Sequence, residues 1–355
     1  MSNESIHVAM FPSAGMGHLT PFLRLASLLL THHCKVTLIT PLPTISHAES
    51  QLLSNFHSSF PQLNLIPFHL PPPPSPPISG DPFFLRVQTL RNSTHLLPPL
   101  ISSLSPPLSL FISDIFLLSP LISVTQKLSL PNYILFTSSA SMFSFFSHFP
   151  TLAQSKFDNV DQIQIPVPGM VSPLPYSSIP PFLFQPTIFR SLMMEDSPNL
   201  TKLHGVFLNT FEALESHSLK ALNDGKVVKD MPPVYAVGPF VPFEFEKKEG
   251  ESSSLSSSSL SLINWLDDQP IGSVVYVCFG SRTALGRDQM REIGNGLMKR
   301  DEIGDAIKEI MENELLKVKA MELKEGGRKA ISVGGDCDVT IQKLIQKWKN
   351  DVNNV

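Results

Sequence analysis

The sequence predicts an α/β protein with a parallel sheet, because apolar runs and amphipathic helical patterns alternate through its first two thirds. The clearest unit comes first: an apolar run at 6–11, the turn Gly15-Met16-Gly17-His18, and an amphipathic run at 21–30. A strand, a turn and a helix placed there leave His18 at the carboxyl end of the strand. Ligands of open α/β sheets bind at that edge, so the turn is a candidate site.

Further strands are expected where short apolar runs recur, and helices where the apolar period lengthens. The strands are expected at 36–40, 63–69, 108–113, 132–136, 205–209 and 234–237, and the helices at 20–31, from about 86 to 103 and from 211 to about 223. The proline block at 71–77 cannot pair in a sheet and is expected to form an exposed loop.

Three interpretations of the His18 turn compete. It is a βα turn with a surface histidine, a dinucleotide fingerprint, or a catalytic histidine whose imidazole accepts a proton near neutrality. The fingerprint fails, because Pro21 stands where a third glycine is needed and no acidic residue occurs between Glu4 and Glu49 to bind a ribose. The turn alone does not decide between the other two.

Composition limits the partners that the protein is expected to bind and the compartment in which it is expected to occur. A net charge of −4 gives no reason to expect nucleic-acid binding. The sequence shows neither a leader peptide nor an apolar run long enough for a membrane span, and three cysteines without metal-ligand spacing suit a reducing compartment. We expect a cytoplasmic monomer without a bound metal.

The second part of the chain begins, like the first, with the pattern of a strand, a turn and a helix, but no further strand pattern follows. A glutamate-, lysine- and serine-rich stretch at 240–262 is expected to be a flexible linker. A short helix is expected near 263–267, a buried strand at 273–279 and a helix from about 287. No apolar strand run follows up to residue 355, and one strand cannot make a sheet. The second domain therefore looks incomplete.

Several motifs, in order along the chain, resemble those of plant UDP-dependent glycosyltransferases. They are Pro-Ser-Ala-Gly-Met-Gly-His-Leu-Thr-Pro at 12–21, Asp114 at a strand end, Val-Gly-Pro at 237–239, Trp-Leu-Asp at 265–267 and Val-Val-Tyr-Val-Cys-Phe-Gly-Ser at 274–281. The first of these, with Asp-Pro-Phe-Phe-Leu-Arg at 81–86, most resembles the flavonoid C-glucosyltransferase branch.

The resemblance implies a GT-B architecture of two Rossmann-like domains. An acceptor-binding domain would span 1–239, the linker 240–262, and a truncated domain for the UDP-sugar 263–355. The implied substrates are UDP-glucose and a flavonoid-like phenol. The implied reaction is a sugar transfer with inversion that uses no cofactor, and the branch resemblance implies that a ring carbon of the phenol can accept the sugar.

The resemblance also assigns roles to residues. His18 matches the general base and Asp114 the carboxylate that orients it. The residues alone favour a helix N-cap at Asp114 instead. The implied donor-binding residues are Gly17, Thr137, Gly280, Ser281 and Thr283, which ordinary turn chemistry also explains, and the implied acceptor-binding residues are Phe83, Phe84 and Arg86, which a buried helix entrance also explains.

One departure from the family concerns the donor site. The family's signature with His-Cys-Gly-Trp-Asn-Ser is absent, since all histidines precede residue 218 and the only tryptophans are Trp265 and Trp348. A junction between Arg300 and Asp301, with on the order of a hundred residues lost, would explain this. The sequence leaves two functions open: a glycosyltransferase of low turnover, or a catalytically silent remnant that binds an acceptor or an intact relative.

Overall fold

The computed structural model describes residues 5–43, 46–72, 81–154, 163–241, 257–270, 273–274, 276–278, 280, 285–298 and 302–353. The chain folds as two compact units, and each is described by itself. The first consists of Met1–Phe243 together with Gly326–Val355, and the second is Glu244–Glu325. The predicted boundaries assign residues 326–355 to the second domain instead. These domain boundaries stay a prediction.

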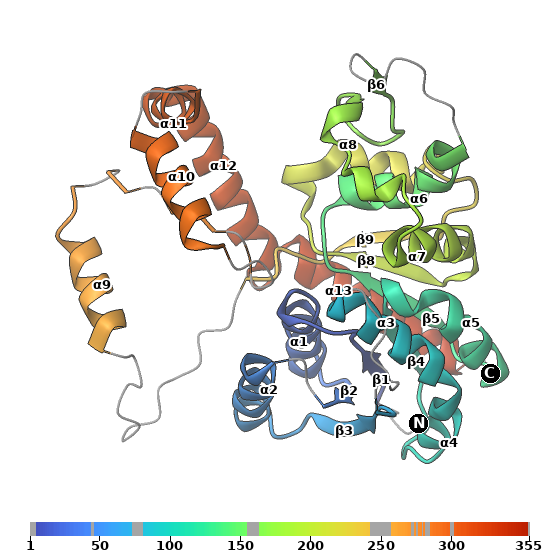
Figure 1. Cartoon of the computed structure of the whole chain (residues 1–355). Helices are drawn as coiled ribbons and strands as arrows, with labels where there is room; N and C mark the ends of the chain where they lie inside the picture. Colours follow the sequence, from blue (N-terminus) through green and yellow to red (C-terminus); the bar gives the residue numbers. More distant parts are fainter. Residues whose placement is uncertain are drawn as a thin grey trace. The chain divides into compact units, whose positions relative to one another are not determined.

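The first unit is built on a seven-stranded sheet in which every neighbouring pair is parallel (Figure 1). The strand order is β3-β2-β1-β4-β5-β8-β9. The strands are β1 (His7–Phe11), β2 (Lys35–Leu42), β3 (Asn64–His69), β4 (Leu110–Asp114), β5 (Asn132–Phe136), β8 (Gly205–Leu208) and β9 (Val234–Ala236). The predicted α/β class and all seven predicted strands of this half are confirmed.

The order in which the chain adds strands to the sheet reverses at β1, and this reversal determines where the candidate site lies. Strand β1 pairs with β2 on one side and with β4 on the other, so the chain order reverses between β1 and β4. Every residue of β1, β4 and β5 is buried, as their continuous apolar runs predict for central parallel strands. In open sheets a crevice forms outside the carboxyl ends of the strands at such a reversal.

Helices connect the strands. They are α1 (Met16–Thr31), α2 (His47–Ser59), α3 (Pro82–Ser93), α4 (Leu97–Ser102), α5 (Leu118–Lys127), α6 (Ala140–Gln154), α7 (Ile188–Asp196) and α8 (Glu212–Asn223), with short 3₁₀ helices η1 (Thr94–Leu96), η2 (Ile115–Leu117), η4 (Tyr176–Ser178), η5 (Pro181–Leu183) and η6 (Ser197–Lys202). An antiparallel pair, β6 (Gln164–Ile165) and β7 (Leu174–Pro175), was not expected.

Two helix predictions need correction. Helix α1 begins at Met16 and not near residue 20, so His18 lies in its first turn. The helix predicted to run to 103 is divided at η1, because Pro98 and Pro99 lack the N–H that a helix interior needs and instead fit the first turn of α4.

The C-terminal residues belong to the first unit. Helix α13 (Asp336–Asn353) buries Ile341, Leu344 and Trp348 among the residues of its inner face. The Trp348 indole N–H donates to the Tyr133 hydroxyl of β5 at 3.0 Å, and the Asp338 carboxylate lies 2.7 Å from the imidazole Nε2 of His32. Helix α13 therefore packs on the same sheet that the N-terminal half forms (Figure 1).

The described secondary structure of the second unit is helical. It contains α9 (Ser257–Asp267), α10 (Arg287–Met298), α11 (Glu302–Glu312) and most of α12 (Glu314–Ile331). The buried strand predicted at 273–279 is wrong for its described residues, which form no strand: Val274 is 40%, Tyr276 86% and Val277 46% exposed. A strand needs a neighbour for its backbone groups, and the described residues of this unit supply none.

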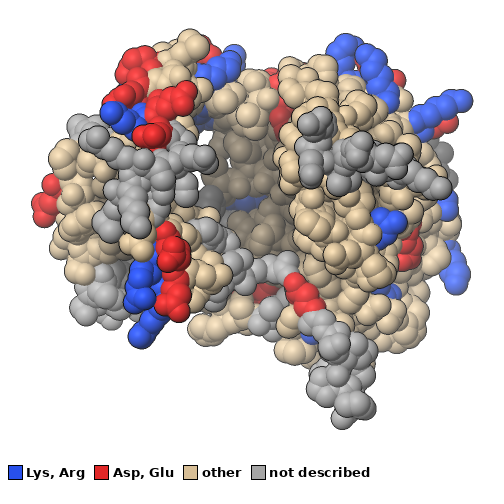
Figure 2. All heavy atoms as spheres, turned by 45° about the horizontal axis from the view of Figure 1, so that its top comes forward, with Lys and Arg blue, Asp and Glu red and all other residues tan. Residues whose placement is uncertain are grey.

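Three predicted features lie largely outside the described residues. They are the junction at 300/301, the proline block at 71–77, of which 73–77 are not described, and the linker at 240–262, of which 242–256 are not described. The last residues of the predicted linker, 257–262, form the start of helix α9. No helix of the described part is long and apolar enough to cross a membrane. On the face that Figure 2 shows, acidic and basic side chains of the described residues are interspersed.

Candidate active site

The two residues predicted to form a catalytic pair lie together at the reversal of the sheet. His18 comes from the first turn of α1, directly after β1, and Asp114 is the last residue of β4. The imidazole Nδ1 of His18 lies 2.6 Å from Asp114 Oδ2. The Asp114 side chain is fully buried and that of His18 is 18% exposed, so the pair is a buried carboxylate behind a partly accessible imidazole.

A backbone turn at Gly15 brings His18 to this position. Gly15 has φ +88°, a left-handed conformation that favours glycine, and a Cβ there would lie 3.5 Å from the Phe83 ring. Its carbonyl accepts the backbone N–H groups of His18 and Leu19 at 3.0 Å each, which starts the helix. Gly17 is different: it is exposed in the first turn, and a Cβ there would meet nothing within 4 Å.

Asp114 serves two partners, one with each oxygen. Its Oδ1 accepts the backbone N–H of Phe116 at 3.0 Å and caps the 3₁₀ turn η2, while its Oδ2 contacts His18. Both interpretations of Asp114 from the sequence, the cap and the histidine partner, are therefore realised in its geometry. When His18 Nδ1 carries the proton that Asp114 accepts, Nε2 is the nitrogen with the acceptor lone pair.

Aromatic rings from α3 and η2 flank the imidazole, and a ring from α7 extends the cluster. The centroids of Phe116 and Phe83 lie 5.3 Å and 5.7 Å from that of His18. Phe84 lies edge-on to Phe83 and 5.3 Å from Phe189 of α7. Phe83 and Phe84 were predicted here; Phe116 and Phe189 were missed, although the position of Phe116 two residues after Asp114 was a signal that could have found the first.

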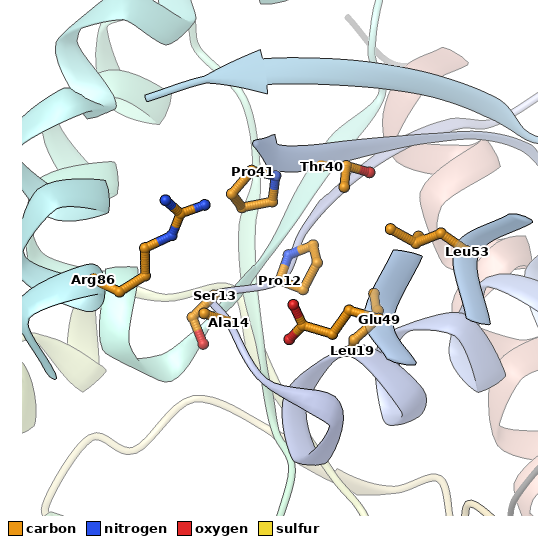
Figure 3. A pocket seen from close by; sticks show the side chains of 9 residues that line it. All are labelled: Pro12, Ser13, Ala14, Leu19, Thr40, Pro41, Glu49, Leu53 and Arg86. Atoms are coloured by element: carbon orange, nitrogen blue, oxygen red, sulfur yellow. The ribbon is translucent and has the colours of Figure 1, made fainter. Parts of the chain in front are cut away.

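Arg86, the third predicted acceptor residue, lies in a neighbouring pocket (Figure 3). It projects from α3 one turn beyond Phe83, and its guanidinium donates to the Pro43 carbonyl. The pocket lies at the carboxyl ends of β1 and β2, where Ser13, Thr40 and Glu49 also line it. Its volume of about 20 Å³ is room for one water molecule. Burial lowers the pKa of Arg86, and the charge of Glu49 opposes that effect.

Thr137 follows β5 at the same edge of the sheet, in a loop that Glu215 holds. The Glu215 carboxylate accepts the backbone N–H groups of Ala140 and Ser141 at 2.8 and 2.9 Å and the Thr210 hydroxyl at 2.6 Å. Burial would raise the pKa of Glu215, but these hydrogen bonds outweigh it and leave the pKa lowered. No sequence pattern predicts this contact, because Glu215 lies at a non-helical kink within α8.

The remaining predicted donor residues belong to the second unit. Gly280 is described and has φ +75°. Ser281 and Thr283 lie outside the described residues. Their role, like those of the other predicted site residues, stays a prediction.

Comparisons with known proteins agree with the fold. No family model matches the chain. It is 38% identical to UDP-glycosyltransferase 708D1 of Glycine max over a 481-residue alignment that covers 99% of this chain and 98% of that protein. It is 50% identical to UDP-glycosyltransferase 708G2 of Citrus unshiu over 299 residues, which are 82% of this chain and 61% of that protein.

Solved structures give the same result. LpCGTa in complex with UDP superposes with a TM-score of 0.68 at 41% identity, covering 83% of this chain and 64% of that chain. Medicago truncatula UGT71G1 complexed with UDP-glucose has a TM-score of 0.81 over 98% of this chain at 22% identity, which is a likeness of fold alone.

A parallel sheet with a histidine–aspartate pair at its reversal, together with these superpositions, defines a GT-B-type fold with a shortened second domain. The chain belongs to the plant UDP-glycosyltransferase family, in which the 708 enzymes and proteins named CGT are its relatives. It spans about three fifths of the length of the Citrus relative. More than a hundred positions of the Glycine relative have no counterpart in these 355 residues, so the predicted shortening is confirmed.

Proposed function

We propose that the His18–Asp114 pair deprotonates a phenolic hydroxyl of a flavonoid-like acceptor, which takes a glucosyl group from UDP-glucose. The observation that carries this proposal is the 2.6 Å contact between a buried carboxylate and a partly exposed imidazole at the ligand-binding edge of the sheet. Membership of the UDP-glycosyltransferase family supports the donor, and the relatives named CGT support transfer to carbon.

In the proposed reaction, His18 Nε2 accepts the phenolic proton while the acceptor attacks the anomeric carbon of glucose. UDP leaves with the electron pair of the broken glycosidic bond. Asp114 accepts the Nδ1–H of His18, fixes the tautomer that leaves Nε2 basic, and stabilises the imidazolium that forms. For transfer to carbon, the phenolate passes electron density to the neighbouring ring carbon, which attacks and then loses its own proton as aromaticity returns.

The aromatic side chains around His18 suit a flat acceptor. Phe83, Phe84, Phe116 and Phe189 form a connected cluster with centroid separations of 5.2 to 6.3 Å. Such rings offer an apolar surface to a flavonoid ring and exclude water beside the base, which strengthens its interaction with Asp114.

The shortened second domain limits the proposed reaction. In the family that the chain resembles, a histidine-containing helix presents its N-terminal N–H groups to the diphosphate of the leaving group. The sequence signature of that helix, His-Cys-Gly-Trp-Asn-Ser, is absent here. Loss of a single preorganised donor costs about 3–4 kcal/mol, or roughly 10²–10³ in rate. We therefore expect a turnover at least that much lower than that of a full-length relative.

A second candidate function is acceptor binding without transfer, alone or beside an intact relative. The specific observation in its favour is the exposure of Val274, Tyr276 and Val277, which would lie in a buried strand of a complete donor domain. The two functions differ in whether a UDP-sugar is used at all.

The test is a transfer assay with the purified chain, UDP-glucose and a polyhydroxylated flavonoid, followed by mass spectrometry of the products. We expect slow formation of a glucoside that survives acid hydrolysis, because a carbon–carbon bond resists acid. The variant His18→Ala should abolish it, whereas His57→Ala, on the exposed face of α2, should not. A glucoside formed equally well by His18→Ala would refute the proposed base, and no product from any variant would favour the second function.

A further inference from the structure

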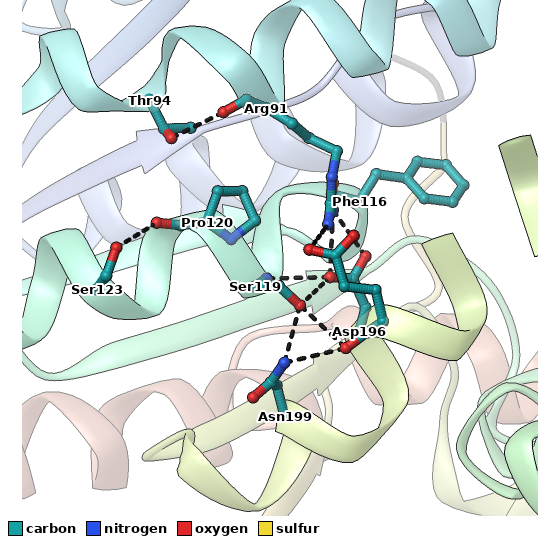
Figure 4. A network of polar contacts seen from close by, with 9 residues as sticks. Arg91, Thr94, Phe116, Ser119, Pro120, Ser123, Asp196 and Asn199 are labelled. Atoms are coloured by element: carbon teal, nitrogen blue, oxygen red, sulfur yellow. Dashed lines mark hydrogen bonds and ion pairs between the residues drawn. The ribbon is translucent and has the colours of Figure 1, made fainter. Parts of the chain in front are cut away.

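A buried arginine lies directly behind the histidine–aspartate pair. Arg91 is in α3, and its side chain is only 7% exposed. Its Nη1 donates to the carbonyl of Phe116 in η2 and to both carboxylate oxygens of Asp196, at 2.8 and 3.2 Å (Figure 4). Its Nη2 lies 2.7 Å from Glu195 Oε1. One guanidinium therefore joins α3, η2 and the end of α7.

Asp196 neutralises this arginine and ties a further helix to it. The carboxylate is fully buried, and it accepts the backbone N–H of Ser119 at 3.0 Å as well as the Ser119 hydroxyl. Ser119 is in the first turn of α5, where backbone N–H groups lack helical partners. Burial raises the pKa of Asp196, and the charge of Arg91 opposes that effect most strongly.

The arginine is connected to His18 by three consecutive contacts through one peptide segment. Arg91 holds the carbonyl of Phe116, the N–H of Phe116 binds Asp114 Oδ1 at 3.0 Å, and Asp114 Oδ2 contacts His18 at 2.6 Å. The Phe116 ring also packs 5.3 Å from the imidazole. The orientation of η2 therefore sets both the rotamer of Asp114 and one wall beside His18.

The same helix contributes a second ring beside the imidazole. Phe83 lies two turns before Arg91 in α3, and its ring is 5.7 Å from His18 and 6.1 Å from Phe116. Holding α3 against η2 thus fixes both rings that pack beside the imidazole. A buried ion pair contributes little net stability, since the cost of dehydrating two charges offsets their attraction. Its geometric effect is therefore the larger one.

We propose that Arg91 is a positioning residue for the His18–Asp114 pair, acting through the Phe116 peptide with Asp196 as its counter-ion. The importance of this role for a reaction rests on the proposed function, but the role itself is a property of the free protein. It requires that loss of the Arg91 contact changes how Asp114 meets His18.

The test replaces both charges at once, with Arg91→Met and Asp196→Asn in one protein. The net charge near His18 is unchanged, the asparagine oxygen still accepts from Ser119, and an uncharged replacement of a buried pair commonly folds. In ¹⁵N-histidine spectra of the protein without substrate, we expect the ratio of Nδ1–H to Nε2–H tautomer at His18 to fall about fivefold to tenfold, the effect of one weakened hydrogen bond.

The matched control is Arg190→Met. Arg190 lies in α7, also donates to a backbone carbonyl, that of Leu183 at 2.9 Å, and also packs on an aromatic ring, Phe149. We expect no change in the tautomer ratio of His18. A folded double variant with an unchanged ratio would overturn the proposal.

A milder variant keeps the proposal testable if the double variant does not fold. Arg91→Lys retains the charge opposite Asp196 but loses the planar fork that reaches Phe116 and Asp196 together. A smaller fall in the same ratio supports the proposal, and an unchanged ratio overturns it. Because no substrate is present, failure of glucosyl transfer cannot be mistaken for failure of this inference.

Discussion

At the scale of single residues, Asp114 shows how one side chain meets a structural and a chemical requirement together. The sequence left a helix cap and a histidine partner as alternatives, and the structure assigns one oxygen to each. The distinction matters for substitution, because a carboxamide replaces one of the two oxygens with an NH₂ group, which donates and cannot accept an N–H at that position.

Two substitutions of Asp114 separate these roles. Asp114→Ala leaves the buried N–H of Phe116 without an acceptor and is expected to lower the free energy of unfolding by about 1–3 kcal/mol. Asp114→Asn can keep the cap and is expected to cost less than Ala, while the His18 imidazole loses the Nδ1–H tautomer. Urea unfolding and ¹⁵N-histidine spectra measure the two effects. Equal stability of the two variants would contradict the assigned cap.

At the scale of elements, the start of α6 depends on a carboxylate from another helix. Glu215 accepts from the N–H groups of Ala140 and Ser141, which open α6, and its own backbone leaves helical geometry to do so. A carboxylate at a helix N-terminus is also favoured by the helix dipole. This contact helps to fix the loop that carries Thr137, together with the loop's own Ser139, whose hydroxyl accepts the N–H of Met142 at 3.1 Å.

Glu215 should therefore contribute a pH-dependent part of the stability. Its pKa in the folded chain is lowered from the ordinary value of 4.5, so its contribution is complete above that value and is lost as pH falls through the folded pKa. Glu215→Gln is expected to cost about 1–3 kcal/mol at pH 7 and progressively less in acid.

Urea midpoints between neutral and acid pH measure this, with Glu212→Gln, at an exposed position of the same helix, as the control. A cost for Glu215→Gln that stayed constant down to acid pH would contradict the assigned hydrogen bonds.

Elements also show where sequence patterns suffice. Buried parallel strands are continuous apolar runs, so the central strands of the first unit could be predicted. The edge strands β3 and β9 are only partly buried, and their short apolar runs predicted them. The starts of helices were harder to predict: the first helix was predicted at 20–31, yet α1 begins at Met16. The run at 273–279 has the pattern of a strand, but a pattern cannot form a strand when the described residues of its unit supply no neighbour.

The site was predictable in part for the same reason. His18 and Asp114 follow strands that pair in the sheet, so topology alone brings them to one edge. Phe189, Arg91 and Asp196 come from helices whose packing no local pattern encodes. Their positions follow only from the tertiary structure.

At the scale of the whole molecule, α13 fastens the C-terminal residues to the first unit. Trp348 is buried against Tyr133 and Phe207 and donates to the Tyr133 hydroxyl. Burial raises the pKa of the Tyr133 hydroxyl, and this effect outweighs the hydrogen bond with Trp348, which lowers it. The residues after the shortened region thus complete the fold of the first unit.

Trp348→Ala tests this packing. It removes a buried aromatic side chain and leaves a cavity, so we expect a loss of about 3–5 kcal/mol in the free energy of unfolding. Lys347→Ala, at the exposed neighbouring position, should change it by less than about 0.5 kcal/mol. Thermal or urea unfolding of the whole chain measures the change in stability for both variants. A Trp348→Ala protein of unchanged stability would show that α13 does not pack on the sheet.

The central claim is that this chain keeps the acceptor half of a glycosyltransferase site and has lost most of the donor half. The most direct measurement is a calorimetric titration of UDP into the purified 355-residue protein. We predict no saturation below about 1 mM, which corresponds to a binding free energy weaker than about −4 kcal/mol. Saturable binding at micromolar UDP would contradict the claim, because it would require the remaining helices of the second unit to form a donor site.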